Sequence, residues 1–151
     1  LAENGGVVQV CFVPSYLKIS EPNPDRDSAR FALREKYGSF RNLDEATLAE
    51  ARREWFEIER KYPENLPEVS DLVNHIDHIV KVAGIDHVGI GSDFDGGGAL
   101  KDCFDVSQMQ NITAELMRRG YSGKEIRKIW GGNFMRVFSE VIKAAGRGNA
   151  T

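Results

Sequence analysis

His87-Val-Gly-Ile-Gly-Ser-Asp-Phe-Asp-Gly96 is the stretch of sequence that decides the fold. It predicts a short buried strand, from His87 to Asp93, that runs into a glycine-rich loop. Successive side chains of a strand point to opposite faces, so one face is predicted to carry no side chain until a carboxylate arrives. That face comprises Gly89, Gly91 and Asp93. Asp93 would then sit at the carboxyl end of the strand, where α/β folds place their chemistry.

A second strand and several helices are predicted around this one. Residues 7–13 form another short apolar run, which predicts a buried strand. Apolar residues recur at three- and four-residue steps elsewhere, which predicts about four to five helices. They cover residues 44–62, 67–83, 112–119, 122–129 and the chain from 132 or 133 onward, and residues 30–37 are a candidate for a further short helix. A helix between two buried strands implies a parallel pair with a right-handed crossover, which is an α/β arrangement.

The strand and helix phases also predict which side chains are buried. The most buried should be Val8, Val10, Phe12, Val88 and Ile90. On a helical wheel of residues 67–83, the apolar stripe is centred near Ile76, and His78 lies almost opposite. His78 is therefore predicted to be exposed.

Five segments of the chain carry a resemblance that is specific in order and spacing. They are Gly5–Val13, Asn74–Ile79, Ala83–Gly96, Asn111–Leu116 and Trp130–Phe138. Together they resemble the end of the membrane (renal) dipeptidase family of zinc metallopeptidases. The stretch from about Ile19 to Tyr62 is similar to the longer insert of the bacterial members.

The resemblance implies a TIM-like (β/α)₈ barrel. At 151 residues the chain is too short for a whole barrel, which needs roughly 200 residues or more. We therefore expect residues 1–151 to be the C-terminal portion of a single metallodipeptidase barrel domain, with two of its parallel strands. The chain also opens at Leu1 without a methionine, and the simplest interpretation is a fragment of a longer protein.

Asp93 is the candidate catalytic residue. From the residues alone, a turn or capping aspartate explains this position as well as catalysis does. The resemblance implies that Asp93 lies beside two zinc ions, serves the proton transfer of the metal-bound water and binds the amino end of a dipeptide. A metal-activated water needs a base within hydrogen-bond reach, so the chemistry is consistent. The expected activity is zinc-dependent hydrolysis of dipeptides.

Tyr16 and Asp95 are the candidate substrate-binding residues. Tyr16 follows the first strand and so lies at the same end as Asp93, where a tyrosine lines the substrate pocket in the family that the chain resembles. Packing within its own loop is an equal alternative. Asp95 is two residues beyond Asp93, and shaping the loop is the simpler interpretation of it.

No metal site is expected within this chain. His78 is predicted to face solvent, His75 lies on the flank of its helix, and His87 starts its strand, at the wrong end for a barrel active site. The resemblance places the ligands of both zinc ions on preceding strands, as a His-x-Asp pair, a glutamate and two further histidines. None of those segments is present here.

Net charge and hydropathy limit the classes of binding partner that the chain is expected to have. A net charge of −3 and a pI near 5.7 argue against nucleic acid. No apolar run is long enough for a membrane segment in this chain. We expect a cytoplasmic protein with a dipeptide substrate, and a homodimer is open. Two other classes also stay open: a different amidohydrolase-type barrel hydrolase, acting on a cyclic amide, lactone or phosphoester, and a non-catalytic fragment that needs a partner chain.

Overall fold

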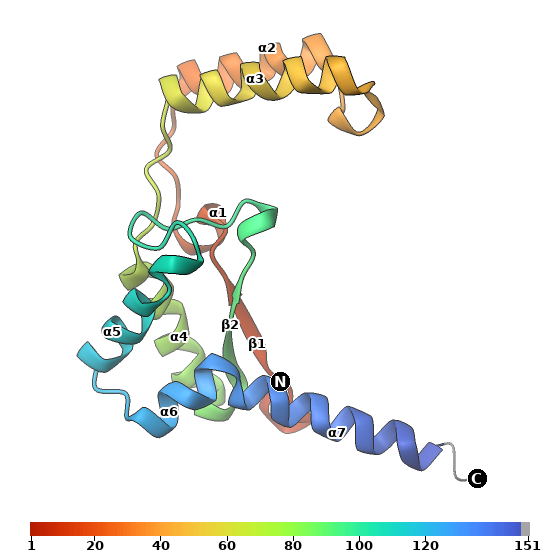
Figure 1. The fold of residues 1–151 in the computed structure, drawn as a ribbon. Coiled ribbons are helices and arrows are strands. Elements are labelled where there is room, and N and C mark those ends of the chain that lie inside the picture. Colours follow the sequence, from red (N-terminus) through yellow and green to blue (C-terminus); the bar gives the residue numbers. More distant parts are fainter. Residues whose placement is uncertain (149–151) are drawn as a thin grey trace. The chain divides into compact units, whose positions relative to one another are not determined.

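The computed structural model describes residues 1–148 and contains two compact units. The first unit joins Leu1–Ile19 to the chain from Leu66 onward, and the second is Ser20–Asn65. Figure 1 shows the first unit as a strand pair with helices beside it and the second as a pair of helices.

Two short parallel strands organise the first unit. β1 (Val8–Cys11) pairs with β2 (Val88–Ser92), with Val8 opposite Val88 and a register shift between Val10 and Cys11. The predicted parallel pair is confirmed. Both strands are shorter than predicted, because Pro14 starts a helix soon after β1 and the backbone turns sharply at the end of β2.

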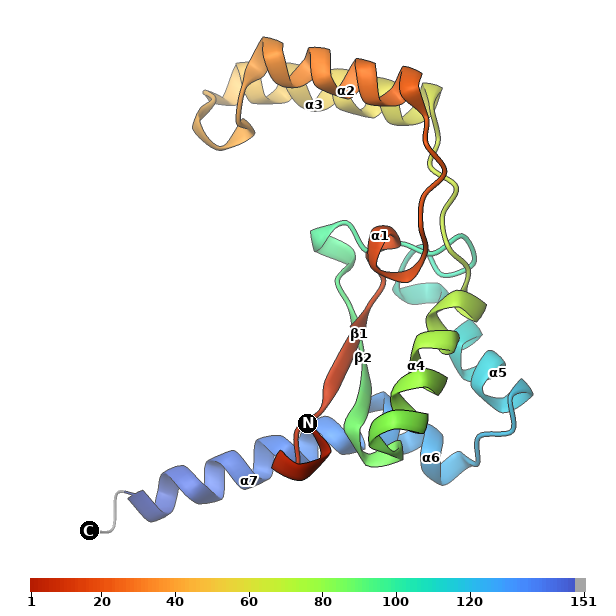
Figure 2. The same ribbon diagram turned by 180° about the vertical axis from the view of Figure 1, so that it is seen from behind.

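α-Helices account for about half of the described residues of the first unit. They are α1 (Pro14–Leu17), α4 (Val69–Ala83), α5 (Gln110–Arg118), α6 (Gly123–Arg127) and α7 (Asn133–Gly148). All except the short α1 match predicted helices to within a few residues. Between α6 and α7, a π-helical turn over Lys128–Gly132 contains the non-helical Gly131, which lies between the two helices predicted in this part of the chain. Figures 1 and 2 show α4 running beside the strand pair.

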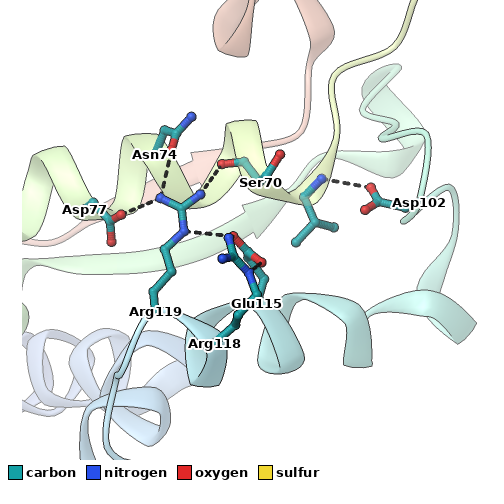
Figure 3. Close-up of polar contacts among 8 residues, drawn as sticks. Ser70, Asn74, Asp77, Asp102, Glu115, Arg118 and Arg119 are labelled. Atoms are coloured by element: carbon teal, nitrogen blue, oxygen red, sulfur yellow. Dashed lines mark hydrogen bonds and ion pairs between the residues drawn. The ribbon is translucent and has the colours of Figure 1, made fainter.

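Side chains accept hydrogen bonds from otherwise unpaired backbone amides at the N-termini of several helices. Ser122 and Glu125 form a capping box at the start of α6, and Glu68 and Asp71 form another at α4. Asp102 reaches α4 from a distant loop and accepts a hydrogen bond from the Val69 amide at 2.8 Å (Figure 3). This contact fixes the loop that follows β2 to the start of α4.

The core lies between the strand pair and the apolar faces of α4 and α5. Its fully buried side chains include Phe12, Leu72, Val73, Ile76, Val88, Leu100, Ile112, Leu116 and Ile129. The predicted burial of Val10, Phe12 and Val88 is confirmed, as is the exposure of His78. Ile90 is only half-buried, and Val8 is 37% exposed, so its predicted burial is wrong. Val8 opens β1, where the pairing with β2 has only begun.

Arg119 fastens α5 to α4. Its guanidinium donates to the Asn74 side chain at 2.7 Å, to the Ser70 carbonyl at 2.8 Å and to Glu115 at 2.8 Å, and it forms an ion pair with Asp77 at 2.5 Å (Figure 3). Only 18% of the Arg119 side chain is exposed, so these contacts are partly shielded from water. One side chain thereby ties two helices of the core together.

The second unit is a helical hairpin of α2 (Pro24–Tyr37) and α3 (Glu45–Lys61). The helix expected over residues 30–37 begins at Pro24 instead, because Asn23 caps it by accepting from the Arg26 amide and Pro24 suits the first turn. Arg30 of α2 donates to both carboxylate oxygens of Glu59 of α3, at 2.9 and 2.7 Å. The hairpin thus has cross-helix contacts of its own.

Within the described residues, no helix is long and apolar enough to cross a bilayer.

Candidate functional site

The loops that follow β1 and β2 meet at the carboxyl edge of the strand pair. The Phe12 amide donates to the Ser92 carbonyl at 2.7 Å, and the Ala99 amide donates to the Phe12 carbonyl at 3.1 Å. The loop after β2 is therefore bonded to the end of β1 on both sides of Asp93. Figures 1 and 2 both show α1 and the residues after β2 beyond the same end of the strands.

Asp93 leaves the strand through a left-handed turn. Ser92 has φ 44° and Asp93 has φ 73°, and these are the two described non-glycine residues with positive φ. The strand therefore ends at Ser92, and the two-residue alternation that placed Asp93 on the face of Gly89 and Gly91 does not extend to Asp93. That part of the prediction is wrong, because the turn, and not the strand, sets the direction of the Asp93 side chain.

The glycines after Asp93 make this turn possible. The Asp93 carbonyl accepts hydrogen bonds from the amides of Gly96 at 3.0 Å and Gly98 at 2.7 Å. A β-carbon on Gly98 would lie 2.5 Å from the Ser92 carbonyl oxygen, and one on Gly96 would collide with the Asp93 carboxylate. The backbone is therefore too close for a side chain at Gly98, whereas a side chain at Gly96 would displace the Asp93 carboxylate.

An aromatic contact supports the loop from the core side. The half-buried Phe94 packs edge-on against the fully buried Phe12, with 5.4 Å between ring centroids and 83° between ring planes. Phe94 directly follows Asp93, so its ring anchors the turn to the core.

The carboxylate of Asp93 is exposed and, among residues 1–148, accepts no hydrogen bond. Asp95 is also exposed, in the 3₁₀ turn Phe94–Gly96. Tyr16 lies in α1 and is 70% exposed. The structure thus places all three predicted site residues at one edge and leaves each accessible, although none contacts another through a hydrogen bond in the described part of the chain.

Gln9 occupies the space that the strand glycines leave. A β-carbon on Gly89 would collide with the Gln9 side-chain oxygen, and one on Gly91 would lie 3.1 Å from the Gln9 β-carbon. The Gln9 oxygen is buried without a hydrogen-bond partner in the described residues. A side chain of the neighbouring strand thus fills the space on the face that the strand glycines leave empty. A polar residue in an apolar strand, opposite a Gly-x-Gly strand, was the available signal.

The histidines have other roles. His75 Nε2 lies 3.0 Å from the Leu17 carbonyl oxygen, and His87 Nδ1 lies 2.7 Å from that of Gly6. Among residues 1–148 there is no group of three or more histidine, cysteine or acidic side chains placed to hold a metal ion. The location of the metal ligands outside this chain stays a prediction.

Comparison with known proteins identifies similarity to dipeptidases. Residues 1–151 match the family model described as membrane dipeptidase (peptidase family M19). A dipeptidase of Aspergillus terreus, ataJ, is 47% identical over 83 residues, which are 54% of this chain and 20% of that protein. A dipeptidase of Claviceps purpurea, tcpJ, is 40% identical over 78 residues, 51% of this chain and 18% of that protein.

A solved structure is similar in fold as well. The probable dipeptidase PvdM from Pseudomonas aeruginosa superposes with a TM-score of 0.68 at 36% sequence identity. The match covers 94% of this chain and 38% of PvdM. The matched regions thus span about a fifth of the two curated relatives and well under half of PvdM.

Proposed function

Because the chain belongs to the membrane dipeptidase family, peptidase family M19, we propose that the complete protein hydrolyses the peptide bond of dipeptides and that Asp93 carries the proton transfer. The dipeptidases named above support the reaction. The conformation of Asp93 supports the assignment of the proton transfer to this residue, and it is the observation on which that assignment rests.

Backbone strain supports a functional role for Asp93. Non-glycine residues held at positive φ cost about 1–3 kcal/mol each and persist only where the surroundings impose them. Ser92 and Asp93 are held in this way by hydrogen bonds from Phe12 and Gly98. The product of this strain is an exposed carboxylate with no internal hydrogen bond in the described residues, at the carboxyl end of a parallel strand. A simple turn aspartate would be expected to bond its own loop.

We propose that β1 and β2 are the last two strands of a TIM-like barrel whose other strands come from preceding sequence. Two zinc ions, held by ligands on those strands, would supply a water of lowered pKa and polarise the peptide carbonyl. The open carboxylate of Asp93 fits a place beside such ions as a proton acceptor. It does not fit as part of a ligand set among residues 1–148, since no group of three or more potential ligands is placed there to hold a metal ion.

The residues of this chain then have distinct tasks. An oxygen of the Asp93 carboxylate accepts the proton of the attacking water and returns it to the leaving amine. The same negative charge attracts the ammonium group of the dipeptide. Tyr16 lines the substrate pocket with its exposed ring, and Asp95 shapes the loop and lies at the margin of the pocket.

Purified complete protein tests the proposal. We expect hydrolysis of dipeptides, loss of activity on removal of metal by a chelator, and recovery on addition of zinc. Cyclic amides, lactones and phosphoesters serve as the comparison set. Faster turnover of one of those substrates than of any dipeptide would assign the protein to another amidohydrolase-type reaction.

A further inference from the structure

The hairpin of α2 and α3 contains a pocket that the proposed catalysis does not use. It has a volume of about 730 Å³ and lies between the two helices and the loop that joins them. Its lining combines three arginines, one aspartate and three aromatic rings. These residues are Asp27, Arg30, Phe31, Arg34, Phe40, Arg41 and Trp55.

One wall of the pocket is built from fixed side chains. The Arg30 guanidinium lies over the Trp55 ring, 5.1 Å from its centroid, and is held there by its two hydrogen bonds to Glu59. Trp55 packs edge-on against Phe40 at 6.4 Å. These contacts hold two nearly perpendicular aromatic rings and one guanidinium in place before a ligand arrives.

Two cations at the loop end of the pocket are available to a ligand. Arg34 and Arg41 line the pocket, both are exposed, and neither forms an ion pair with any residue from 1 to 148. Guanidinium groups bind carboxylates through paired hydrogen bonds. This end of the pocket therefore matches a carboxylate.

The other end carries a negative charge. Asp27 precedes Arg34 by seven positions on α2, which puts the two on the same face and about 10 Å apart along the helix. The Asp27 side chain is largely exposed, and its Oδ1 lies 3.9 Å from Nε of Arg26. This weak contact leaves the Asp27 carboxylate open to a cation. The pocket thus matches a ligand with a cation at one end, a carboxylate at the other and an apolar body between them.

A dipeptide fits this separation better than a single amino acid does. An extended dipeptide separates its ammonium and carboxylate by about 7 Å, which the side chains of Asp27 and Arg34 can close. An amino acid carries both groups on one carbon. We propose that the hairpin pocket is a second, non-catalytic binding site for dipeptides with aromatic side chains. The choice of a dipeptide rests on the proposed hydrolysis.

The test uses the complete protein and an analogue of phenylalanyl-phenylalanine in which CH₂ replaces the peptide nitrogen, so that no peptide bond remains to be cleaved. Calorimetry should show two sites per chain. The ¹⁹F resonance of 5-fluorotryptophan at position 55, assigned with Trp55→Phe, should shift as the pocket fills. Arg34→Ala combined with Arg41→Ala should leave one site and weaken the response at Trp55 about tenfold or more, because it removes charge-assisted hydrogen bonds.

Two controls isolate the chemistry. Arg52→Ala removes an exposed arginine of α3 that does not line the pocket, and the response at Trp55 should be unchanged. Asp27→Asn should weaken the analogue with a free amino group and leave its N-acetyl form unaffected. An equal loss with Arg52→Ala, or none with the double variant, would overturn the inference.

The inference and the proposed function fail in different ways. If the protein hydrolyses dipeptides and the Trp55 resonance does not respond to the analogue, the second site is wrong and the hydrolysis stands. If Trp55 responds in protein that hydrolyses no dipeptide, the site is supported and the proposed reaction is wrong.

Discussion

Ser92 and Asp93 show how a strained turn can expose a single carboxylate. A strand that continued would have buried Asp93 or aimed it by alternation, whereas the left-handed turn lifts it clear of the pair. Two contacts offset the energetic cost of the positive φ angles. The amides of Gly96 and Gly98 donate to the Asp93 carbonyl, and the Phe94 ring packs on Phe12. Because the Asp93 carboxylate takes no part in the contacts that hold its turn, both its oxygens stay available for substrate and water.

Replacing Asp93 by asparagine in the complete enzyme keeps the shape of the side chain and removes the proton acceptor. Loss of a positioned general base costs about 10²- to 10⁴-fold in rate. We expect turnover to fall by this amount, with zinc content and thermal unfolding nearly unchanged. Asp95→Asn, two residues away and equally exposed, is the matched control and should cost much less.

The outcomes of that comparison separate three roles. If Asp93 only formed the turn, Asp93→Asn would lower stability and spare turnover of the folded fraction. If Asp93 were a metal ligand, the metal would be lost together with activity. Near-normal dipeptide hydrolysis by Asp93→Asn would contradict the assignment.

Gly98 offers a second prediction at the residue scale. An alanine there would press its β-carbon against the carbonyl oxygens of Ser92 and Asp93, at 2.5 and 2.7 Å, so the turn must open. We expect Gly98→Ala to destabilise the fold by about 1–3 kcal/mol and to reduce turnover beyond the loss of folded protein. Denaturant titration and kinetics on the same samples measure both effects.

Gly146→Ala is the control, because nothing lies within 4 Å of the added methyl group in α7. It should raise stability slightly, by about 0.5–1 kcal/mol, since alanine is the better helix former. A Gly98→Ala protein with normal turnover and stability would show that the loop is looser than its contacts indicate.

At the scale of elements, α4 and α5 are joined by a charged cluster as well as by apolar packing. Hydrogen bonds from Arg118, and then from Arg119, lower the pKa of Glu115 to about 2. Burial and the hydrogen bond to Asp77 raise the pKa of Tyr121, whose hydroxyl donates to Asp77 at 2.6 Å. The cluster is built to stay ionised at Glu115 and neutral at Tyr121.

The lowered pKa of Glu115 predicts a pH dependence of stability. A carboxyl group whose folded pKa lies below its unfolded value of 4.5 stabilises the fold fully above that value. The contribution is lost as pH falls from about 4.5 toward 2. Glu115→Gln removes this titration, so its stability deficit against the unmodified protein should shrink across that range. Urea unfolding at a series of pH values measures it, with the exposed Glu57→Gln as control. A deficit that stays constant would contradict the prediction.

The sequence predicts those elements whose pattern is local. The stripe through Leu72, Val73 and Ile76 predicts α4, and the Ser122–Glu125 spacing predicts the start of α6; both are confirmed. The candidate helix over residues 30–37 omits the first turns of α2, although Asn23-Pro24 is a strong signal for a helix start.

The candidate site was predictable in its position and not in its geometry. Gly-rich sequence after a strand predicted a loop that carries Asp93 at the carboxyl edge. The direction of that side chain depends on hydrogen bonds from Phe12 and on the close approach of Gly98, contacts between segments far apart in the chain. The hydrogen bond from Phe12 cannot be predicted from the sequence within ten residues of Asp93, because Phe12 lies far away in the chain.

At the scale of the whole molecule, α7 presents an apolar face that no described element covers. Phe134 and Phe138 stack with 6.1 Å between centroids and are 47% and 49% exposed, and Val141 and Ile142 continue the stripe at 60% and 56%. Two strands alone also leave sheet edges unpaired. A barrel completed by preceding sequence would cover such surfaces, and the part of PvdM outside the matched region has the length to do so.

The exposed face of α7 predicts how residues 1–151 behave when produced alone. Burial of apolar area is worth about 25 cal/mol per Å², so an uncovered aromatic stripe favours self-association. We expect concentration-dependent oligomers in sedimentation, and Phe134→Ser with Phe138→Glu should shift them toward monomer. Phe31→Ser changes an exposed aromatic residue of the hairpin, serves as the matched control and should change self-association little.

Addition of the preceding part of the complete protein should compete with self-association of the unmodified chain, since both would use the α7 face. A chain that stays monomeric at all concentrations, or a double variant that associates as strongly as the original, would show that α7 is not the surface on which the rest of the protein packs.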